Sequence, residues 1–489
     1  MTAQTILPAN TLSSGYDVAN SLMFDDGSTP YLTRTISSGA DMTAFTFSFW
    51  LKRSTLGATQ RIISSDHTDS KDMYIRFESD DTFGMYHRRT ASENVISGFG
   101  TAAKFKDTSA WYHFVINMDS NESTEADRLK MYVNGTRVTT FAGTVHYPTS
   151  GEYANFFNSS EKTDIGYYRT NNGENFDGYL AEVVAIQGTA YQASSFGEFD
   201  SDSPNIWKPK DVSGLTFGTN GFYMEFQQSG TSQNSSGMGA DTSGNDNHFA
   251  TSGLASTDQT TDTCTNNYAT LNPNQSNNAK DSVNSLAEGN LRFNDTNNAD
   301  WRTVIGTLGV NSGKWYWEAE VVGMNGSILV GVGRQNYLTT TLNKTSSAYP
   351  GADSGDFSAS YRENGTFFTN GSSSSGKSTF TSAGDIVMVA LDMDNGAVYF
   401  GVNGTWNDSG DPTSGASKTG ASYTGIQTGE FYSPSVSGSA TNSTIDFNFG
   451  NPPFTISSGN TDSAGYGNFE YSVPSGYYAL NSKNLAKYG

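Results

Sequence analysis

The sequence has almost no cysteine and little histidine. Its 489 residues include one cysteine, Cys264, so no internal disulfide can form. None of the five histidines is spaced as in an H-x-x-x-H zinc site. Cys264 lies in a Thr/Asn-rich stretch without a recognisable base partner, and no G-x-S-x-G nucleophile motif occurs. The sequence therefore gives no support to thiol, zinc or serine-hydrolase chemistry.

Positive charge is also scarce. Lysine and arginine number 28 against 49 aspartates and glutamates, which gives a formal net charge of -21. The densest basic spot is the short run of His87, Arg88 and Arg89. Nucleic-acid phosphates would be repelled by such a chain in the absence of a basic patch. We therefore expect no nucleic-acid partner.

Long apolar runs are missing as well. No stretch approaches the roughly 20 apolar residues that a membrane-spanning helix requires, so we expect no membrane insertion. The first residues, MTAQTILPAN, lack the basic region and apolar core of a signal peptide. The sequence predicts a protein made in a cytoplasm and not exported by a standard signal.

Aromatic residues and glycines are abundant and follow a strand pattern. Phe, Trp and Tyr make up 13% of the chain, and there are 52 glycines. Apolar side chains recur at every second position in residues 45–51, 111–118 and 315–321. This period of two is typical of antiparallel sheets, and no long amphipathic helix is visible. In 315–321 the pattern predicts that Glu318 and Glu320 face outward, away from the core and into solvent.

The four residues VNGT occur twice, at 133–136 and 402–405, each time after an alternating strand. Asn-Gly supplies the two positive-φ residues that a type I′ hairpin turn needs. The sequence thus predicts two hairpin tips, one in each half of the chain.

Composition divides the chain into five predicted segments. They are an N-terminal anchoring arm (1–20), a first sandwich (21–210), an irregular Ser/Thr/Asn/Gly-rich connector (211–290), a second sandwich (291–455) and an aromatic C-terminal tail packed on the sandwich (456–489). The predicted fold class is all-β, with two antiparallel β-sandwiches joined by the connector.

Ordered motifs in each block resemble known families. The first block resembles a laminin-G-like, concanavalin-A-type jelly roll, on FTFSFWLKR (45–53), WYHFVI (111–116), LKMYVNG (129–135), DIG (164–166) and FDGYLAEVVAI (176–186). The second resembles a SPRY domain, on GKWYWEAEV (313–321), ILVGVG (328–333), GDIVMVALDMDNGAVYFGVNGTW (384–406) and YSPSVS (432–437). Both resemblances imply concanavalin-A-like β-sandwiches.

The flanking stretches resemble proteins of tailed bacteriophages. Residues 241–273 and 446–486 are similar to the flanks of SPRY-bearing phage proteins, and the N-terminal stretch is similar to the start of phage proteins with a laminin-G-like domain. The resemblance implies a virion structural protein, such as a tail fibre, tail-associated adhesin or capsid fibre. Its implied partners are other virion proteins and a host-surface glycan or receptor. By family analogy it would be a homo-oligomer, with a trimer favoured.

Three other functions can be derived from the sequence, and the first of them lacks the structural context that it needs. GSSSSGKS (371–378) matches the phosphate-loop pattern, but Gly384 follows too soon for the helix that this loop needs. A glycan depolymerase would need two carboxylates, and Glu318 with Glu320 is the visible pair, although the E-x-D-x-x-E motif of glucanases is absent. A stand-alone lectin-type module is the third. We assign no catalytic residue.

Loop aromatics and amides are candidates for sugar binding. The candidates are Tyr167, Tyr168, Asn171, Asn172, Arg334, Tyr337, Tyr349 and Trp406. Their alternative role is to cap sheet edges. The short acidic spacing of Asp66, Asp69 and Asp72 is typical of calcium loops, and laminin-G-like domains often bind calcium at a rim. Solvated acids are the alternative there, and no other cofactor is expected.

Overall fold

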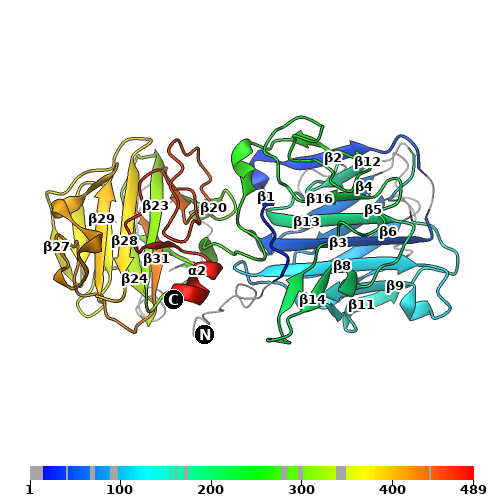
Figure 1. Ribbon diagram of the computed structural model, residues 1–489, viewed down its shortest axis with the longest axis horizontal. Coiled ribbons are helices and arrows are strands. Elements are labelled where there is room, and N and C mark those ends of the chain that lie inside the picture. The colour runs from blue at the N-terminus through cyan, green and yellow to red at the C-terminus, as the bar shows by residue number, and fades with distance from the viewer. Residues whose placement is uncertain are drawn as a thin grey trace. The chain divides into compact units, whose positions relative to one another are not determined.

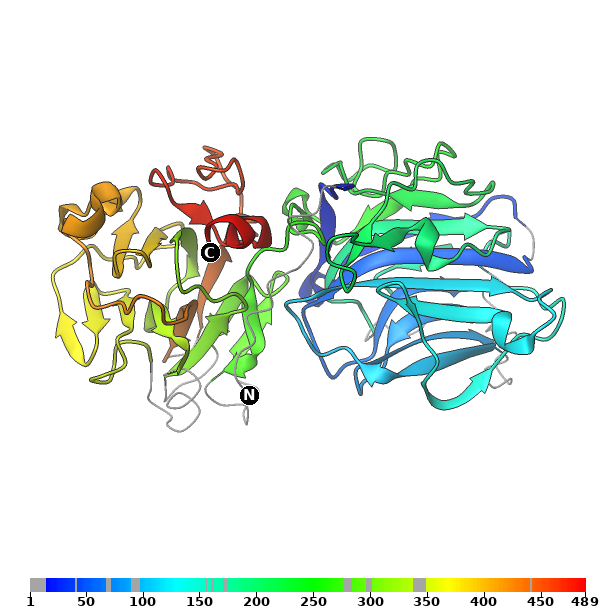
Figure 2. The same ribbon diagram turned by 60° about the horizontal axis from the view of Figure 1, so that its bottom comes forward.

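The computed structural model describes residues 15–39, 42–66, 72–88, 97–154, 156–159, 162–169, 174–276, 284–295, 301–336, 349–439 and 442–489. The chain divides into two compact units, one of Ser13–Thr265 and one that includes Asn266–Gly489. Each is built from antiparallel sheets (Figure 1, Figure 2), which confirms the predicted all-β fold class. Nowhere in the described ranges does a helix have the length and apolar character needed to cross a membrane.

The first unit pairs two eight-stranded sheets. Sheet 1 has the order β10 (Thr136–Arg137), β9 (Leu129–Val133), β8 (Trp111–Asp119), β3 (Ala44–Arg53), β13 (Gly178–Gln187), β1 (Ser21–Phe24) and β18 (Gln259–Thr260), with β16 (Phe222–Met224) also on β13. Sheet 2 has the order β11 (Phe141–His146), β7 (Ser97–Lys104), β6 (Thr82–Arg88), β5 (Asp72–Phe77), β4 (Gln60–Asp66), β12 (Lys162–Ile165), β2 (Tyr31–Thr35) and β17 (Ala250–Ser252). A separate ribbon joins β14 (Gly197–Phe199) to β15 (Trp207–Pro209).

The second unit has the same plan. Sheet 3 has the order β30 (Thr405–Trp406), β29 (Ala397–Val402), β28 (Ile386–Asp392), β23 (Lys314–Gly323), β32 (Ser443–Asn448), β21 (Arg292–Asp295) and β20 (Asn284–Ala287), with β33 (Tyr478–Ala479) also on β23. Sheet 4 has the order β27 (Ser372–Ser374), β26 (Thr366–Thr369), β25 (Ala359–Arg362), β24 (Ile328–Arg334), β31 (Tyr432–Gly438), β22 (Arg302–Gly306) and β19 (Leu271–Ser276). The chain ends in helix α2 (Ser482–Tyr488).

The strand orders of the two units correspond. In sheet 1, β9-β8-β3-β13-β1 run in the order that β29-β28-β23-β32-β21 follow in sheet 3. In sheet 2, β7-β6-β5-β4-β12-β2-β17 correspond to β27-β26-β25-β24-β31-β22-β19 in sheet 4. The two halves are therefore two versions of one sandwich, with every strand of these paths in an equivalent place.

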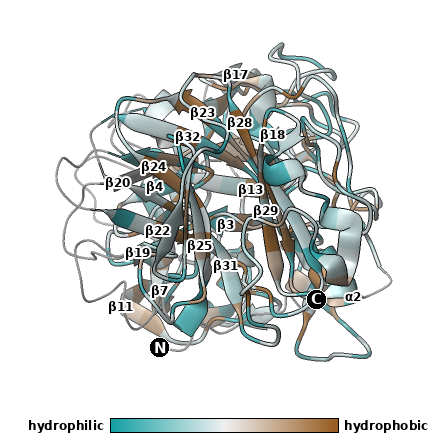
Figure 3. Cartoon of the chain, turned by 90° about the vertical axis from the view of Figure 1, so that its left-hand side faces the viewer, coloured by the Kyte–Doolittle hydropathy of each residue, from teal (hydrophilic) through white to brown (hydrophobic). Residues whose placement is uncertain are grey.

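Alternating apolar residues form the core between the sheets. In β3, Phe45, Phe47 and Phe49 are fully buried in the core of the first unit. In β23, Trp315 and Trp317 are fully buried in the core of the second. Each such ring contributes on the order of 2–3 kcal/mol by leaving water. Figure 3 shows apolar residues gathered along strands such as β28 and β29, with hydrophilic residues in many loops.

The outer face of sheet 1 is covered by the chain itself. Residues 191–217 lie over it, and Phe196, Trp207 and Phe217 form a second buried cluster with Trp50 and other sheet residues. The centre of this cluster is His113 of β8, whose ring stacks with Trp50 at 4.7 Å and accepts a hydrogen bond from Trp207 Nε1 at 2.9 Å. Sheet 1 is thus buried on both faces.

Sheet 3 is covered in the same way by the C-terminal segment. Phe469 and Tyr477 pack on Tyr316 and its neighbours, which are buried. Glu318 accepts hydrogen bonds from the backbone N–H of Glu470 at 2.9 Å and of Tyr471 at 2.8 Å, and it is fully buried. The prediction that Glu318 faces outward into solvent is therefore wrong: it faces away from the core, but the tail covers it.

The stretch predicted as an irregular connector, 211–290, supplies strands to both sandwiches. β16, β17 and β18 pair with β13, β2 and β1 of the first unit. β19 and β20 pair with β22 and β21 of the second. The strands are short and mostly polar because backbone hydrogen bonds, which any sequence can make, are enough to hold a strand at a sheet edge.

Both VNGT tips are hairpin turns, as the sequence predicts. Asn134 and Gly135 have φ of 46° and 77°, and Asn403 and Gly404 have 49° and 82°. Each asparagine side chain accepts a hydrogen bond from the neighbouring strand, at 2.8 Å from His113 N and from Ile386 N.

The glycine of each turn also lies against an aromatic ring of the covering segment. A Cβ at Gly135 would stand 2.3 Å from the ring of Trp207, and one at Gly404 would stand 3.0 Å from the ring of Tyr471. Each hairpin tip therefore has space for an aromatic side chain only because glycine is there.

The Gly135→Ala substitution should destabilise the first unit strongly. It adds the cost of a positive φ, ~1 kcal/mol, to overlap with Trp207, which together give a loss of about 3 kcal/mol in the free energy of unfolding. Gly143→Ala is the matched control because its φ is 79° and nothing lies within 4 Å of the added carbon. Urea unfolding followed by tryptophan fluorescence measures both. Equal losses would show that the contact with Trp207 is unimportant.

His113 should make the first unit sensitive to acid. Burial lowers the pKa of His113 to about 3, so the folded protein keeps it neutral. The unfolded chain binds a proton at this residue below about pH 6.5, so the free energy of unfolding should fall as pH drops, by ~2–3 kcal/mol between pH 6.5 and 4.5. The His113→Gln variant should lack this part of the pH dependence in urea titrations. If the free energy of unfolding depended on pH in the same way in both proteins, His113 would not be the source of the acid sensitivity.

Candidate functional site

The outer face of sheet 2 carries a set of arginines and tyrosines. Alternation places them there, since Met73, Ile75 and Phe77 of β5 point into the core and the residues between them point outward. We call this set the arginine–tyrosine face. It consists of Tyr31, Arg61, Tyr74, Arg76, Tyr86, Arg88, Tyr167, Tyr168 and Arg169.

Strands β5 and β6 bring two pairs of polar residues together as cross-strand neighbours. Asp72 is directly opposite Arg88, and Tyr74 is directly opposite Tyr86. Arg88 donates from Nε and Nη2 to the two carboxylate oxygens of Asp72, at 2.8 and 2.6 Å. This two-point hydrogen bond raises the pKa of Arg88. The rings of Tyr74 and Tyr86 are 5.5 Å apart.

Tyr74 lies under three guanidinium groups. Its ring centroid is 3.7 Å from the guanidinium of Arg61, 4.9 Å from that of Arg76 and 5.6 Å from that of Arg88. Tyr168 covers the other side of Arg61 at 3.5 Å. Such cation–π contacts hold the planar guanidinium groups in fixed orientations.

Arg61 is almost fully buried, with an exposed fraction of 2%. Its Nε donates to Glu174 Oε2 at 2.6 Å. Its Nη1 has no hydrogen-bond partner among the described residues. A β-bulge after Arg61 lets Ile62 and Ile63 both face the core while Arg61 faces outward.

A second pair of rings forms the other end of the face. Tyr31 of β2 stacks on Tyr167 at 4.4 Å with the planes 16° apart. The guanidinium of Arg169 lies 5.8 Å from one ring and 6.0 Å from the other, and it forms an ion pair of 2.6 Å with Asp164. The backbone oxygen of Tyr167 accepts a hydrogen bond from Ser64 Oγ at 2.8 Å, which fixes this loop on the sheet.

Tyr86 lies over a part of the sheet that has no other side chains. A Cβ at Gly84 would stand 2.8 Å from Cε2 and the hydroxyl oxygen of Tyr86, and one at Gly100 would stand 3.0 Å from that oxygen. The two glycines are paired across β6 and β7. The ring therefore lies close against the backbone, and larger residues at either position would displace it.

The predicted site residues fall into different places. Tyr167 and Tyr168 belong to the arginine–tyrosine face, while Asn171, Asn172 and Tyr337 lie outside the described residues. The remaining three are in the second unit. Arg334 donates to Gln427 Oε1 at 3.0 Å, Tyr349 packs between Trp301 and Phe368, and Trp406 lies edge-on to Tyr316 at 6.4 Å. These three contact their own unit in sheet 4 or sheet 3.

Sequence reasoning missed Arg61, Tyr74, Arg76 and Tyr86. The signal that could have identified them is the set of polar residues that alternate with the apolar ones. In β5 these are Asp72, Tyr74 and Arg76, at every second position. The apolar residues identify the strand, and the polar residues identify what its outer face carries.

The predicted calcium ligands are partly described. Both carboxylate oxygens of Asp72 accept hydrogen bonds from Arg88, so a cation there would have to displace an arginine. The side chain of Asp66 and all of Asp69 lie outside the described residues. Within the part of the chain that the structure describes, no three His, Cys, Asp or Glu side chains are grouped to hold a metal. Calcium stays a prediction.

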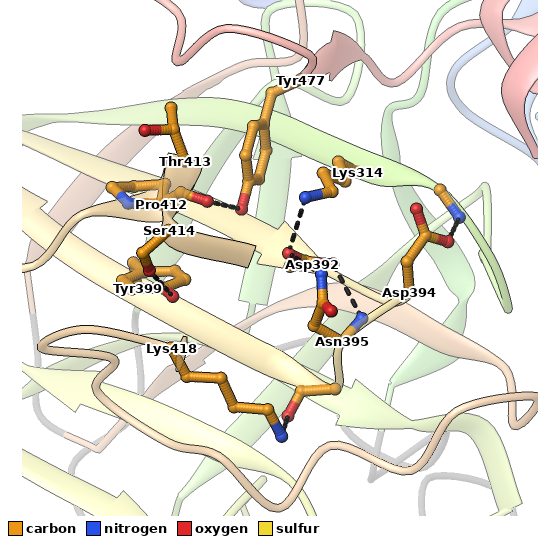
Figure 4. Close-up of polar contacts among 12 residues, drawn as sticks. Lys314, Asp392, Asp394, Asn395, Tyr399, Pro412, Thr413, Ser414, Lys418 and Tyr477 are labelled. Carbon is orange, nitrogen blue, oxygen red and sulfur yellow. Dashed lines mark hydrogen bonds and ion pairs between the residues drawn. The ribbon is translucent and has the colours of Figure 1, made fainter. Parts of the chain in front are cut away.

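A second group of polar side chains surrounds the β28–β29 turn of the second unit (Figure 4). Lys314 Nζ is 2.9 Å from Asp392, which also accepts from the backbone and the side chain of Asn395. Asp394 accepts from Gly313 N at 2.8 Å, and the hydroxyl of Tyr477 donates to Pro412 O at 2.9 Å. These contacts join the start of β23, the turn, a 3-10 segment and the tail. The cluster is a structural connection.

The phosphate-loop pattern does not form a nucleotide site. Strand β27 includes Ser372, Ser373 and Ser374, and no helix follows Lys377. Lys377 Nζ instead forms an ion pair of 2.6 Å with Asp408. The segment is an edge strand and a loop, without the helix N-terminus that would bind phosphate.

Ser48 and His113 resemble a nucleophile and its base but have the wrong tautomer. Because Trp207 Nε1 donates to His113 Nδ1, the neutral ring carries its proton on Nε2, which lies 2.9 Å from Ser48 Oγ. The imidazole donates to this serine and cannot take its proton. Both residues are also buried.

Comparisons with known proteins agree with the two-sandwich architecture. The model described as the concanavalin A-like lectin/glucanases superfamily matches residues 26–193, and the SPRY domain model matches residues 314–452. No curated protein sequence matches the chain.

Three similar solved structures each cover about a third of the chain. The SPRY domain of human HERC1 is 19% identical over 36% of this chain and 96% of that one, with a TM-score of 0.27. A heptameric SAP-like pentraxin from Limulus polyphemus is 15% identical over 36% and 80%, with a TM-score of 0.27. A putative carbohydrate-binding protein from Bacteroides ovatus is 13% identical over 37% and 46%, with a TM-score of 0.25. By the family models alone, residues 26–193 are similar to a concanavalin A-like lectin/glucanase domain and residues 314–452 to a SPRY domain.

Proposed function

We propose that this chain is an attachment protein of a tailed-bacteriophage virion that binds host-surface glycans through the arginine–tyrosine face. The observation that carries the proposal is the contrast between the two outer faces of the first unit. Sheet 1 is covered by residues 191–217, whereas sheet 2 presents fixed guanidinium groups and half-buried tyrosine rings. The phage part rests on the resemblance of residues 241–273 and 446–486.

The face has the two kinds of group that a sugar ring requires. Tyr31, Tyr86, Tyr167 and Tyr168 are half-buried, so parts of their rings can pack against the apolar side of a sugar. The guanidinium groups and their carboxylate partners can donate to and accept from hydroxyl groups. Such sites are open and bind weakly one at a time. A homo-trimer would present three of them to one cell surface, which increases avidity.

The function we propose does not include catalysis. Glu318, half of the visible carboxylate pair, is buried under the tail and accepts hydrogen bonds from Tyr316 and from two backbone N–H groups. Burial raises the pKa of Glu318. His113 carries its proton toward Ser48, which argues against that pair as a nucleophile and base. These contacts favour binding over a glycan depolymerase.

Location on the virion has a separate test. We expect an antibody against the purified chain to label phage particles in immunogold electron microscopy, on the tail or on the capsid surface. Particles without label, produced by a host that makes the protein, would overturn the virion assignment but leave the glycan-binding assignment standing.

The Tyr86→Ala and Tyr168→Ala variants should lose at least about tenfold in affinity for the polysaccharide that the native chain binds, because each removes a stacking surface. An array of purified bacterial lipopolysaccharides and capsular polysaccharides first identifies that polysaccharide. Titration calorimetry then measures the affinity of the native chain and of each variant for it. Phe199→Ala is the control, since Phe199 is an exposed aromatic on the β14–β15 ribbon, which belongs to the cover of sheet 1. Unchanged affinity in both tyrosine variants would contradict this site.

A further inference from the structure

Each guanidinium group of the arginine–tyrosine face has a carboxylate partner, and the guanidinium and carboxylate groups are equal in number. The four ion pairs are Arg61–Glu174 at 2.6 Å, Arg76–Glu78 at 2.8 Å, Arg88–Asp72 at 2.6 Å and Arg169–Asp164 at 2.6 Å. Within these pairs the positive and negative charges are equal in number. The face is therefore rich in charged groups and yet carries no net charge from them.

The pairs are held in place by more than charge. Glu174 contacts both Arg61 and Arg76, the second at 3.7 Å, so two arginines share one carboxylate. Tyr74 lies beneath Arg61, Arg76 and Arg88 and keeps their planes in position. An incoming anion that accepts from a free N–H of one of these arginines lies beside the carboxylate already paired with it, and the repulsion of the two like charges is costly where water is partly excluded.

A hydroxyl group avoids this cost because it both donates and accepts. It can accept from a guanidinium N–H and donate to the carboxylate beside it without breaking the pair. A guanidinium has five N–H donors, and its carboxylate partner occupies one or two of them. The Nη1 of Arg61 is buried, so the donors that a ligand oxygen can reach belong to the partly exposed Arg76, Arg88 and Arg169.

We propose that the arginine–tyrosine face binds neutral, hydroxyl-rich saccharides and discriminates against those that carry carboxylate, sulfate or phosphate groups. This inference rests on the proposed glycan-binding function and specifies its substrate class. Four arginines on one sheet face would by themselves suggest an acidic glycan. Their pairing with carboxylates, in a chain of net charge -21, reverses that expectation.

The test uses the full chain and a glycan array that holds neutral oligosaccharides beside their sulfated, carboxylated and phosphorylated counterparts. We expect the neutral member of each bound pair to bind at least about tenfold more tightly, and its affinity to change less than about twofold between 50 and 500 mM NaCl, because no ion pair forms with the ligand. Preference for the anionic member, or an affinity that falls fivefold or more with salt, would overturn the neutral class alone. Absence of binding to every member would overturn the proposed function as well.

A charge-changing variant tests the role of the carboxylates directly. Glu78→Gln leaves Arg76 with one fewer carboxylate and should raise the affinity for anionic members at least about fivefold and make it sensitive to salt. Glu198→Gln makes the same change in net charge on the β14–β15 ribbon, where Glu198 pairs with Lys208 at 3.5 Å, and should leave the array pattern unchanged. Equal gains in both variants would show that overall charge decides, and would overturn the pairing argument. Urea unfolding of each variant confirms that it is folded.

Discussion

One sheet of each sandwich carries large side chains on both faces, and this requires a cover. In β3, Phe47 and Phe49 face the core while Trp50 faces the other way, and in β23, Trp317 faces the core while Tyr316 faces away. Leaving such rings in water would cost on the order of 2–3 kcal/mol each. Each unit therefore uses a later segment of its own chain to cover one outer face. The outer face of the opposite sheet in the first unit does not have to bury apolar residues, and it carries arginines, carboxylates and tyrosines instead.

The cover also explains why the same turn occurs twice. The two hairpins occupy equivalent places, at the end of the β8–β9 pair and of the β28–β29 pair. In each, the glycine provides both a positive φ and room for a ring of the covering segment, Trp207 in one unit and Tyr471 in the other. VNGT is thus repeated because the glycine of each copy meets two requirements. It allows the chain to reverse direction, and it leaves room for an aromatic ring of the covering segment.

The sequence was sufficient to predict the fold class, the core faces of the strands and the two turns, because these depend on local periodicity and local backbone conformation. It was not sufficient to predict the fate of Glu318, since alternation tells which side chains point away from the core but not whether another segment lies on top. The arginine–tyrosine face was found only in part for a related reason. Tyr167 and Tyr168 can be recognised as loop aromatics. The residues that they pack against, Tyr31 and Arg61, are more than a hundred residues away in the sequence.

The covers extend past the regions by which the two domains are recognised. The family matches end at residues 193 and 452, whereas Trp207 and Phe217 cover sheet 1, and Phe469 and Tyr477 cover sheet 3. A fragment trimmed to either match would lose core residues, such as Phe222 in the first unit and Phe293 in the second, and would bare a broad apolar surface that associates in solution. Anyone who excises these domains for crystallisation or display should extend the first to about Thr265 and the second to the C-terminal helix.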